Sequence, residues 1–418
     1  MKKAIFTVLA LLFLTAPSFA QLSDELDAYL RAMPQRAGLT THSYEFLPIK
    51  DTPAPRGFKP FYISHYGRHG SRSHSKEKPY ILLQECLQAA ADEGIITPSG
   101  DSLLACARQM FELHAGMGGR LTARGVREHE QLAERMFRRY RRVFRRGEVH
   151  ALSSVVPRCL VSMAAFTSSL KTCKKNLVIT WDCGEKYQHY ITSNTTSALK
   201  KEAAEIINSP LTVFPIDTMA ILSRYFKDPV RGKALCGAPE SFISAIFTVA
   251  RFAEAFDIDE NRFNFLPWEA ITAKYARSNL SLYLGHSNSI AMGDKRMPRA
   301  KPLAMEIVRK ADEAIAGAPV AADLIFGHDL PLMGLCSFLG LEGYGYPRLT
   351  TEEALRSWNG AKLCPFAANL QIVFYKNRKG EVLVKFLTNE QENRIPEIEA
   401  FSGPYYRWED VKNYIINK

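Results

Sequence analysis

One turn of this sequence gathers residues that could bind and attack an anion. The stretch Arg68-His69-Gly70-Ser71-Arg72 follows Phe61–Ile63, an apolar run that predicts a buried strand. Arginine binds phosphate through bidentate, charge-assisted hydrogen bonds, because its planar guanidinium group matches the spacing of the oxygens. We therefore expect the two arginines and the histidine to surround an oxyanion. In the alternative interpretation the arginines pair with acidic residues at the surface.

A third arginine, Arg158, stands where a predicted strand gives way to a helix. The strand covers residues 148–154, and Pro157 favours the first turn of the helix that follows. The amino end of a helix carries free N–H groups and a partial positive charge, and both favour a bound phosphate. Arg158 is therefore a third candidate for phosphate binding.

His328 and Asp329 follow another predicted strand, Asp323–Phe326. Three strands thus end in polar residues, and open α/β sheets bind ligands at the carboxyl ends of their strands. Phosphoryl transfer needs positive charge around the phosphate, an in-line nucleophile such as a neutral histidine, and an acid for the leaving alkoxide. In the alternative interpretation His328 merely ends a strand and Asp329 caps the next helix.

The order of these groups resembles the signature of the histidine phosphatase superfamily, in the branch of acid phosphatases and phytases. Its pattern Arg-His-Gly-x-Arg stands at residues 68–72. The branch's helix start, Gly-x-Leu-Thr-x-x-Gly, is matched at 119–125, and Ser-x-x-x-Arg-x-x-x-Ser at 154–162. The His-Asp pair is similar to that of phytases, whereas multiple inositol polyphosphate phosphatases of the branch commonly carry His-Ala-Glu. The resemblance spans residues 57–390.

The resemblance implies a fold and a set of roles. The fold would be α/β, with a mixed, mainly parallel sheet flanked by helices as in phosphoglycerate mutase, and an inserted, mainly α-helical cap domain. His69 would be the nucleophile and form a phosphohistidine, while the three arginines bind the phosphate. His328 would donate to the transferred group, and Asp329 would protonate the leaving group and then activate water. No metal or other cofactor is implied.

Two positions depart from the family pattern. Cys159 stands where relatives commonly have threonine, and His74 stands where they usually have proline. Proline would stiffen the loop, so its absence puts the shape of the pocket rim in doubt. Lys76 and Lys78 follow closely, and they would either contact a polyanionic substrate or face solvent.

The spacing of apolar residues is compatible with two domains that follow an N-terminal leader of twenty residues. Residues 21–172 and 303–418 would form the α/β catalytic domain, which closes with an antiparallel hairpin at the sheet edge, near residues 368–386. Residues 173–302 are mostly helical and would form the cap domain.

A long helix is predicted from the N-cap Thr122 to about Arg146. One face of it is apolar. The opposite face carries Arg138, Arg139, Arg141, Arg142, Arg145 and Arg146. We interpret this face as solvated, not as a nucleic-acid or lipid site, because no aromatic residues for base stacking accompany the arginines.

The first twenty residues are typical of a secretory signal peptide. Lys2 and Lys3 precede an apolar run from Ala4 to Leu14, and Ala16–Ala20 is a small-residue cleavage pattern. No cysteine follows the cleavage site, and no later stretch is long and apolar enough to cross a bilayer. We therefore expect a periplasmic or secreted protein without a membrane span.

The eight cysteines permit disulfides in such an oxidising compartment, although the sequence leaves their pairing open. Cys173 and Cys183 are near enough in sequence to close one local loop. Scattered buried thiols fit the same sequence. None of the cysteines forms a CxxC pair, so a zinc site is not expected.

Charge and motifs together predict an exported phosphomonoesterase. The chain has 54 basic and 43 acidic residues, and loss of Lys2 and Lys3 would leave a net charge of +9, which attracts anions. We expect inositol polyphosphates such as phytate as substrates, with sugar phosphates or a broad range of monoesters as alternatives. A mutase fits less well, because mutases act on cytosolic metabolites. The rival of another class is a non-catalytic binder of anionic glycans or lipids; no nucleic-acid partner is expected, and the oligomeric state is left open.

Overall fold

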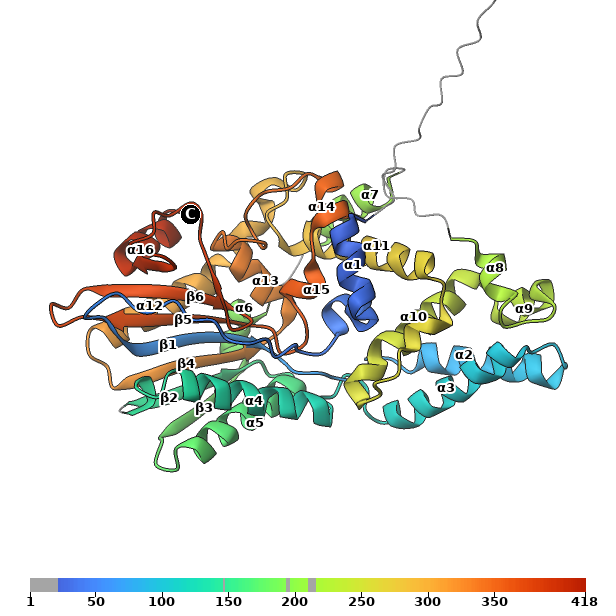
Figure 1. The fold of residues 1–418 in the computed structure, drawn as a ribbon, viewed down its shortest axis with the longest axis horizontal. Helices are drawn as coiled ribbons and strands as arrows, with labels where there is room; N and C mark the ends of the chain where they lie inside the picture. Colours follow the sequence, from blue (N-terminus) through green and yellow to red (C-terminus); the bar gives the residue numbers. More distant parts are fainter. Residues whose placement is uncertain (1–21, 146, 193–195, 210–215) are drawn as a thin grey trace, which may run out of the picture.

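The core of the fold is a mixed sheet flanked by helices, as the sequence predicts (Figure 1). The structure is a computed structural model, and it describes residues 22–145, 147–192, 196–209 and 216–418. The predicted signal peptide, residues 1–20, lies outside the described residues. Within them, no helix combines the length and the apolar character needed to cross a membrane.

Eight strands form the sheet in the order β3-β2-β4-β1-β5-β6-β7, and β8 pairs with β6. The first four in this order are parallel, and the others are antiparallel to their neighbours. The strands are β1 (Lys59–Arg68), β2 (Glu148–Ser153), β3 (Ile179–Cys183), β4 (Val320–Gly327), β5 (Asn369–Lys376), β6 (Val382–Thr388), β7 (Gln391–Asn393) and β8 (Tyr405–Arg407).

The predicted hairpin forms from β5 and β6, but it does not lie at the sheet edge. β5 also pairs with β1 in the middle of the sheet, and β6 pairs in turn with β7 and β8. The predicted edge position is therefore wrong. Local alternation indicates a hairpin, but it cannot report a third strand that pairs from a distant part of the chain.

The parallel pairing of β1 with β4 aligns the residues that could do chemistry. Arg68, the last residue of β1, is in register with Gly327, the last residue of β4. β2 ends one residue short of this level, with Ser153 opposite Phe326 of β4. The residues after these strands, among them His69 and His328, therefore meet at the carboxyl edge of the sheet.

Helices cover both faces of the sheet (Figure 1). On β4, Leu324 and Phe326 belong to the core under α4 and α5, whereas Ile325 belongs to the core on the opposite face. A strand that is apolar on both sides needs such cover, because each face must be removed from water. The covering helices are α4 (Ala123–Arg139) and α5 (Pro157–Cys173) on one face, and α12 (Lys301–Ile315), α13 (Asp329–Phe338) and α16 (Trp408–Asn417) on the other.

A helical layer beside the sheet has its own apolar core. Its main members are α2 (Lys78–Asp92), α3 (Pro98–His114), α8 (Thr218–Leu222), α9 (Pro229–Cys236) and α10 (Pro239–Ala253). α8 to α10 come from the range predicted to be the cap, but α2 and α3 come from the range predicted to be catalytic. β3, near the start of the predicted cap range, pairs with β2 in the sheet. The domain boundaries themselves stay a prediction.

Further helices connect this layer to the sheet and pack mainly into the core on the α13 side. They are α1 (Asp24–Ala32), α6 (Gln188–Ile191), α7 (Ser197–Ile207), α11 (Trp268–His286), α14 (Thr351–Ser357) and α15 (Gly360–Leu363). A 3-10 segment, η1 (Pro34–Thr41), follows α1 and passes close to α10 and α15.

The helix predicted to reach Arg146 is shorter in the structure. α4 starts after its N-cap Thr122, as predicted, but it ends at Arg139. The Arg139 side chain is only 5% exposed and donates to the carboxylate of Asp51 and to the carbonyl of Glu390, so it is not part of a solvated face. Local spacing could not report partners from segments so far away in the chain. Arg146 lies outside the described residues.

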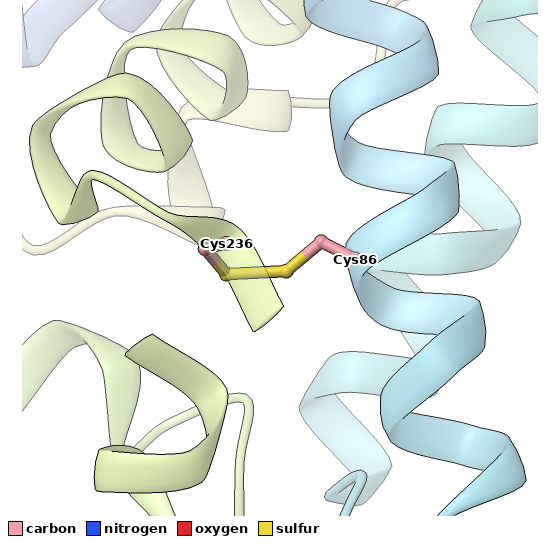
Figure 2. The surroundings of a disulfide bond; sticks show 2 residues. All are labelled: Cys86 and Cys236. Atoms are coloured by element: carbon pink, nitrogen blue, oxygen red, sulfur yellow. A yellow bond between two sulfur atoms is a disulfide. The ribbon is translucent and has the colours of Figure 1, made fainter. Parts of the chain in front are cut away.

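One disulfide joins two helices of the helical layer, Cys86 in α2 and Cys236 at the end of α9 (Figure 2). Cys173 and Cys183, which could have closed a local loop, are both free. The observed pair is 150 residues apart in sequence, so spacing alone could not find it. Because both cysteines belong to the apolar core of the helical layer, the bond holds α9 against α2.

Loss of this disulfide should destabilise the fold, because the bond closes a loop of 150 residues in the unfolded chain. Replacing both Cys86 and Cys236 with serine should lower the free energy of unfolding by about 2–5 kcal/mol, measured by guanidinium unfolding followed by circular dichroism. Replacing the free pair Cys173 and Cys183 is the matched control, with an expected change within about 0.5 kcal/mol. An identical unfolding midpoint for the native protein with and without reductant would contradict the assignment.

Candidate active site

His69 lies at the carboxyl edge of the sheet and is almost fully buried. Its backbone is held on both sides, since its N–H donates to Gly327 at 3.0 Å and its carbonyl accepts from Ala367 at 3.0 Å. The ring Nδ1 lies 2.9 Å from the carbonyl of Gly70. A carbonyl only accepts, so Nδ1 carries the proton and Nε2 keeps its lone pair. This tautomer is the one that a nucleophilic histidine needs.

Burial and positive neighbours keep His69 neutral. Burial is the main cause that lowers its pKa well below 6.5, and Arg68, Arg158 and Arg72 lower the pKa further. The ring of His328 lies beside it, with the two ring centroids 5.9 Å apart and nearly perpendicular. The sequence predicted these residues to meet, and the structure brings them together.

Arg68 is buried and strongly held. Its guanidinium group lies 3.0 Å from the carboxylate of Asp329, and it donates to the carbonyls of Thr40 and Cys364. It also lies over the ring of Phe366, 4.7 Å from the centroid. The alternative interpretation, in which Arg68 pairs with an acidic residue at the surface, is therefore wrong. Arg68 is buried, and its partner is Asp329 of the His-Asp pair.

Arg72 and Arg158 approach the same region from two elements. Arg72 donates to the carbonyl of Ser73 at 2.7 Å, and burial together with Arg68 and Arg158 lowers its pKa to about 10. Arg158 lies in the first turn of α5, and its guanidinium is 3.4 Å from Nδ1 of His328. In all three arginines Nε is buried and donates to no described residue. These N–H groups are donors that an oxyanion could accept from.

His328 and Asp329 begin helix α13, with His328 as the N-cap and Asp329 as the first residue. Nε2 of His328 lies 3.1 Å from the hydroxyl of Ser154. Burial, and then the charge of Arg158, lowers the pKa of His328 to about 4. Burial alone would raise the pKa of Asp329, but Arg68 and Arg72 outweigh it, so the net pKa falls below 3.8.

A buried carboxylate that sequence analysis missed holds the motif loop in place. Glu128, in α4, accepts from the backbone N–H of Ser71 at 2.6 Å, from the Ser71 hydroxyl at 2.7 Å and from the N–H of Tyr44 at 3.1 Å. The signal was present in the sequence, because Glu128 stands four residues before Leu132 on the apolar stripe of the helix. A carboxylate in that position must be either exposed or satisfied by buried donors.

Two glycines let the loop and α4 approach this closely. A Cβ on Gly70 would lie 2.4 Å from the carbonyl oxygen of Gly125, and a Cβ on Gly125 would lie 2.2 Å from that of Ser71. Both separations are far below van der Waals contact, so neither position tolerates a side chain without movement of the backbone. Gly70 of the Arg-His-Gly-x-Arg motif and Gly125 of the Gly-x-Leu-Thr-x-x-Gly motif thus allow the same close backbone contact.

Backbone pairing holds the loop around His74, where relatives usually have proline. The carbonyl of His74 accepts from Gly119 at 2.9 Å, and Ser73 donates to the carbonyl of Arg120 at 3.0 Å. Arg72 and Leu121 form an isolated β-bridge in the same place. Pairing with residues 119–121 thus restrains the rim without the proline ring.

Lys76 lies on the exposed stretch before α2, and Lys78, also exposed, is the first residue of α2. Lys76 offers its carbonyl to Nδ1 of His74 at 2.8 Å. Neither lysine side chain makes an ion pair with any described residue, so the structure leaves both predicted alternatives open. Cys159, in place of the usual threonine, donates its thiol to the carbonyl of Gly327 at 3.2 Å.

A cavity of about 410 Å³ opens beside the motif loop. Its lining includes Arg158, Pro157 and Val161 from α5, Ser75 from the loop and Gly119 from the segment opposite. Among the described residues, no three His, Cys, Asp or Glu side chains are grouped so that they could hold a metal ion. The polar groups of the site are thus mainly cationic, with Asp329 as the carboxylate next to them.

Comparisons with known proteins relate this chain to others by fold. No family model and no curated protein matches it. The multiple inositol polyphosphate phosphatase of Bifidobacterium longum, in complex with phosphate, is similar with a TM-score of 0.76 at 16% identity, over 91% of this chain and 97% of that chain. The phytase from D. castellii gives 0.69 at 14% identity, over 92% and 85%. Hafnia alvei phytase in complex with tartrate gives 0.55 at 12% identity, over 87% and 98%.

These similarities confirm the predicted α/β fold and the predicted likeness to phytases and multiple inositol polyphosphate phosphatases. At such low identity they show the fold alone. The roles of His69, His328, Asp329 and the three arginines stay predictions, although the structure gathers all six residues at one edge of the sheet.

Loss of the Glu128 charge should loosen the loop and destabilise the protein. In Glu128→Gln one oxygen acceptor becomes an NH₂ donor that faces N–H groups, so we expect the free energy of unfolding to fall by about 1.5–3 kcal/mol. Denaturant unfolding measures the change. Glu130→Gln, two positions along the same helix and exposed, is the control and should change little. Equal stabilities for the two variants would rule out the anchoring contact.

Proposed function

We propose that this chain is a phosphomonoesterase that works through a phosphohistidine at His69. The observation that carries the proposal is the hydrogen bond from Nδ1 of His69 to the carbonyl of Gly70 at 2.9 Å, which leaves Nε2 free to attack. The three arginines with buried Nε donors supply the positive charge that a transferred phosphoryl group needs. The fold similarity to two phytases and an inositol polyphosphate phosphatase supports the same reaction class.

In the first step Nε2 of His69 attacks phosphorus, and the bond from phosphorus to the leaving oxygen breaks. Asp329 gives its proton to that oxygen, which leaves as an alcohol. In free protein the arginines keep Asp329 ionised. A bound phosphate offsets the charge of Arg68 and Arg72, so it raises the pKa of the carboxyl and allows it to carry the proton.

In the second step water attacks phosphorus and Asp329 takes a proton from it, so inorganic phosphate forms and His69 is restored. His328 lies between Ser154 and Arg158, where it would donate to the phosphoryl oxygens once protonated. Its pKa of about 4 in free protein would rise beside a phosphate dianion.

For the substrate we propose inositol polyphosphates such as phytate, with sugar phosphates and other monoesters as the broader alternative. The support is the positive net charge of the chain and its fold similarity to phytases, among them Hafnia alvei phytase in complex with myo-inositol hexakis sulphate. We also propose export through the leader at residues 1–20. No observation favours a non-catalytic binder of glycans or lipids.

Release of inorganic phosphate from p-nitrophenyl phosphate and from phytate, with EDTA present, tests the reaction. His69→Ala should lower kcat at least about a thousandfold, because it removes the nucleophile. Asp329→Asn should lower kcat strongly for phytate and far less for p-nitrophenyl phosphate, whose leaving group needs no proton. Lys379→Ala, on the exposed turn between β5 and β6, serves as a surface control. Full activity in His69→Ala, or no release by native protein, would refute the proposal.

The pH profile should lie on the acid side. His69 must be neutral to attack, and its lowered pKa keeps it neutral well below pH 6.5. Asp329 must be protonated to act as an acid, and its pKa in free protein is also lowered, so its protonated fraction falls as pH rises. We expect kcat/KM for phytate to increase from pH 7 to about pH 4.5. Asp329→Asn lacks this titrating carboxyl, so its kcat/KM should increase much less as pH falls. Titration of the substrate affects both proteins alike, so the difference between the two profiles reports Asp329. The same slope of kcat/KM against pH in both proteins would contradict the role.

A further inference from the structure

Arg251 lies in the last turn of α10, and its guanidinium pairs with no carboxylate among the described residues. Its Nε is buried and unbonded, and no hydrogen bond or ion pair from its guanidinium is found within the described part of the chain. Other arginines near the helical layer are paired: Arg231 with Glu93 at 2.6 Å, and Arg124 with Asp257 at 2.9 Å. A half-buried guanidinium without a carboxylate partner is free to bind an anion from outside the chain.

The position of Arg251 connects it to the motif loop through one aromatic ring. Its guanidinium carbon lies 5.1 Å from the centroid of Phe252, and that of Arg72 lies 5.7 Å from the same centroid. The ring of His74 lies 5.1 Å from Phe252 as well. α10 runs from the helical layer toward the sheet (Figure 1), and Arg251 lies in its last turn.

Neighbouring charges agree with this placement. Burial is the main cause that lowers the pKa of His74, and Arg251 lowers it further. The carboxylate next along the chain, Glu254, is already engaged by the N–H of Ser43 at 2.8 Å and lies 3.6 Å from Arg124. Asp329 is paired with Arg68. Both of these carboxylates therefore have other partners.

The backbone of Arg251 is also fixed. A Cβ on Gly38, in η1, would lie 3.3 Å from the Cβ of Arg251 and 3.6 Å from its carbonyl oxygen. The same 3-10 segment supplies the Thr40 carbonyl that accepts from Arg68. One short segment thus sets the positions of an arginine in the sheet domain and an arginine in the helical layer.

We propose that Arg251 binds a second phosphate group of the substrate, while Arg68, Arg72 and Arg158 bind the group that is transferred. This inference rests on the proposed phosphatase function and narrows its substrate class to small molecules with two or more phosphates. A monophosphate ester would be bound by the three motif arginines alone. A polyphosphate would gain a fourth charge-assisted contact, which raises affinity without any change in the chemical step.

The test compares inositol hexakisphosphate with p-nitrophenyl phosphate on Arg251→Ala. We expect kcat/KM for the hexakisphosphate to fall about ten- to a hundredfold, mostly through a higher KM, and that for p-nitrophenyl phosphate to change less than about twofold. Arg251→Lys should restore part of the loss, because it returns the charge. Arg231→Ala, which removes an equal charge from an exposed site in the same layer, should affect neither substrate.

The results distinguish a failure of the Arg251 assignment from a failure of the proposed phosphatase function. An equal loss on both substrates would assign Arg251 a structural role and overturn the inference, as would no loss on either. In both cases phosphate release by the native protein would still support the phosphatase. If native protein releases phosphate from neither substrate, the proposed function falls and the inference falls with it. Melting temperatures of all variants, measured without substrate, identify any variant that is poorly folded.

Discussion

The parallel pairing of β1 with β4 is the constraint on which the site depends. With Arg68 opposite Gly327, the residues that follow each strand emerge at the same level. A shift of one residue would turn each side chain to the opposite face of the sheet and separate His69 from His328. Apolar residues on both faces of β4 resist such a shift, because two cores would lose their contacts together.

Electrostatics then distinguishes this sheet edge from any other. Three helices, α4, α5 and α13, begin at the site, and each contributes the partial positive charge of its amino end. The arginines add full charges, and Asp329 is the carboxylate set among them. Burial is the main cause that lowers the pKa of His69 and of His328, and the arginines lower both further. Both histidines are therefore neutral in free protein, which is the state that the proposed roles require.

Much of this could be predicted from the sequence, because local signals were strong. Apolar runs that end in Arg68-His69, Arg158 and His328 predicted the strands that position these residues, and Pro157 marked the start of α5. What could not be predicted depends on long-range contacts. The partner of Cys86, the end of α4 and the neighbours of β5 are each decided by residues far away in the chain. The sequence did not indicate Arg251 as a binding residue, because it belongs to no motif.

The contact between Gly70 and Gly125 has a consequence for ligand binding. Two backbones that touch without side chains between them leave the loop little room to move, and Glu128 binds it from the same helix. The loop therefore loses its conformational entropy when the chain folds, not when a ligand binds. If an anion binds here as proposed, it finds its donors already ordered, so less of its binding free energy goes into arranging the protein.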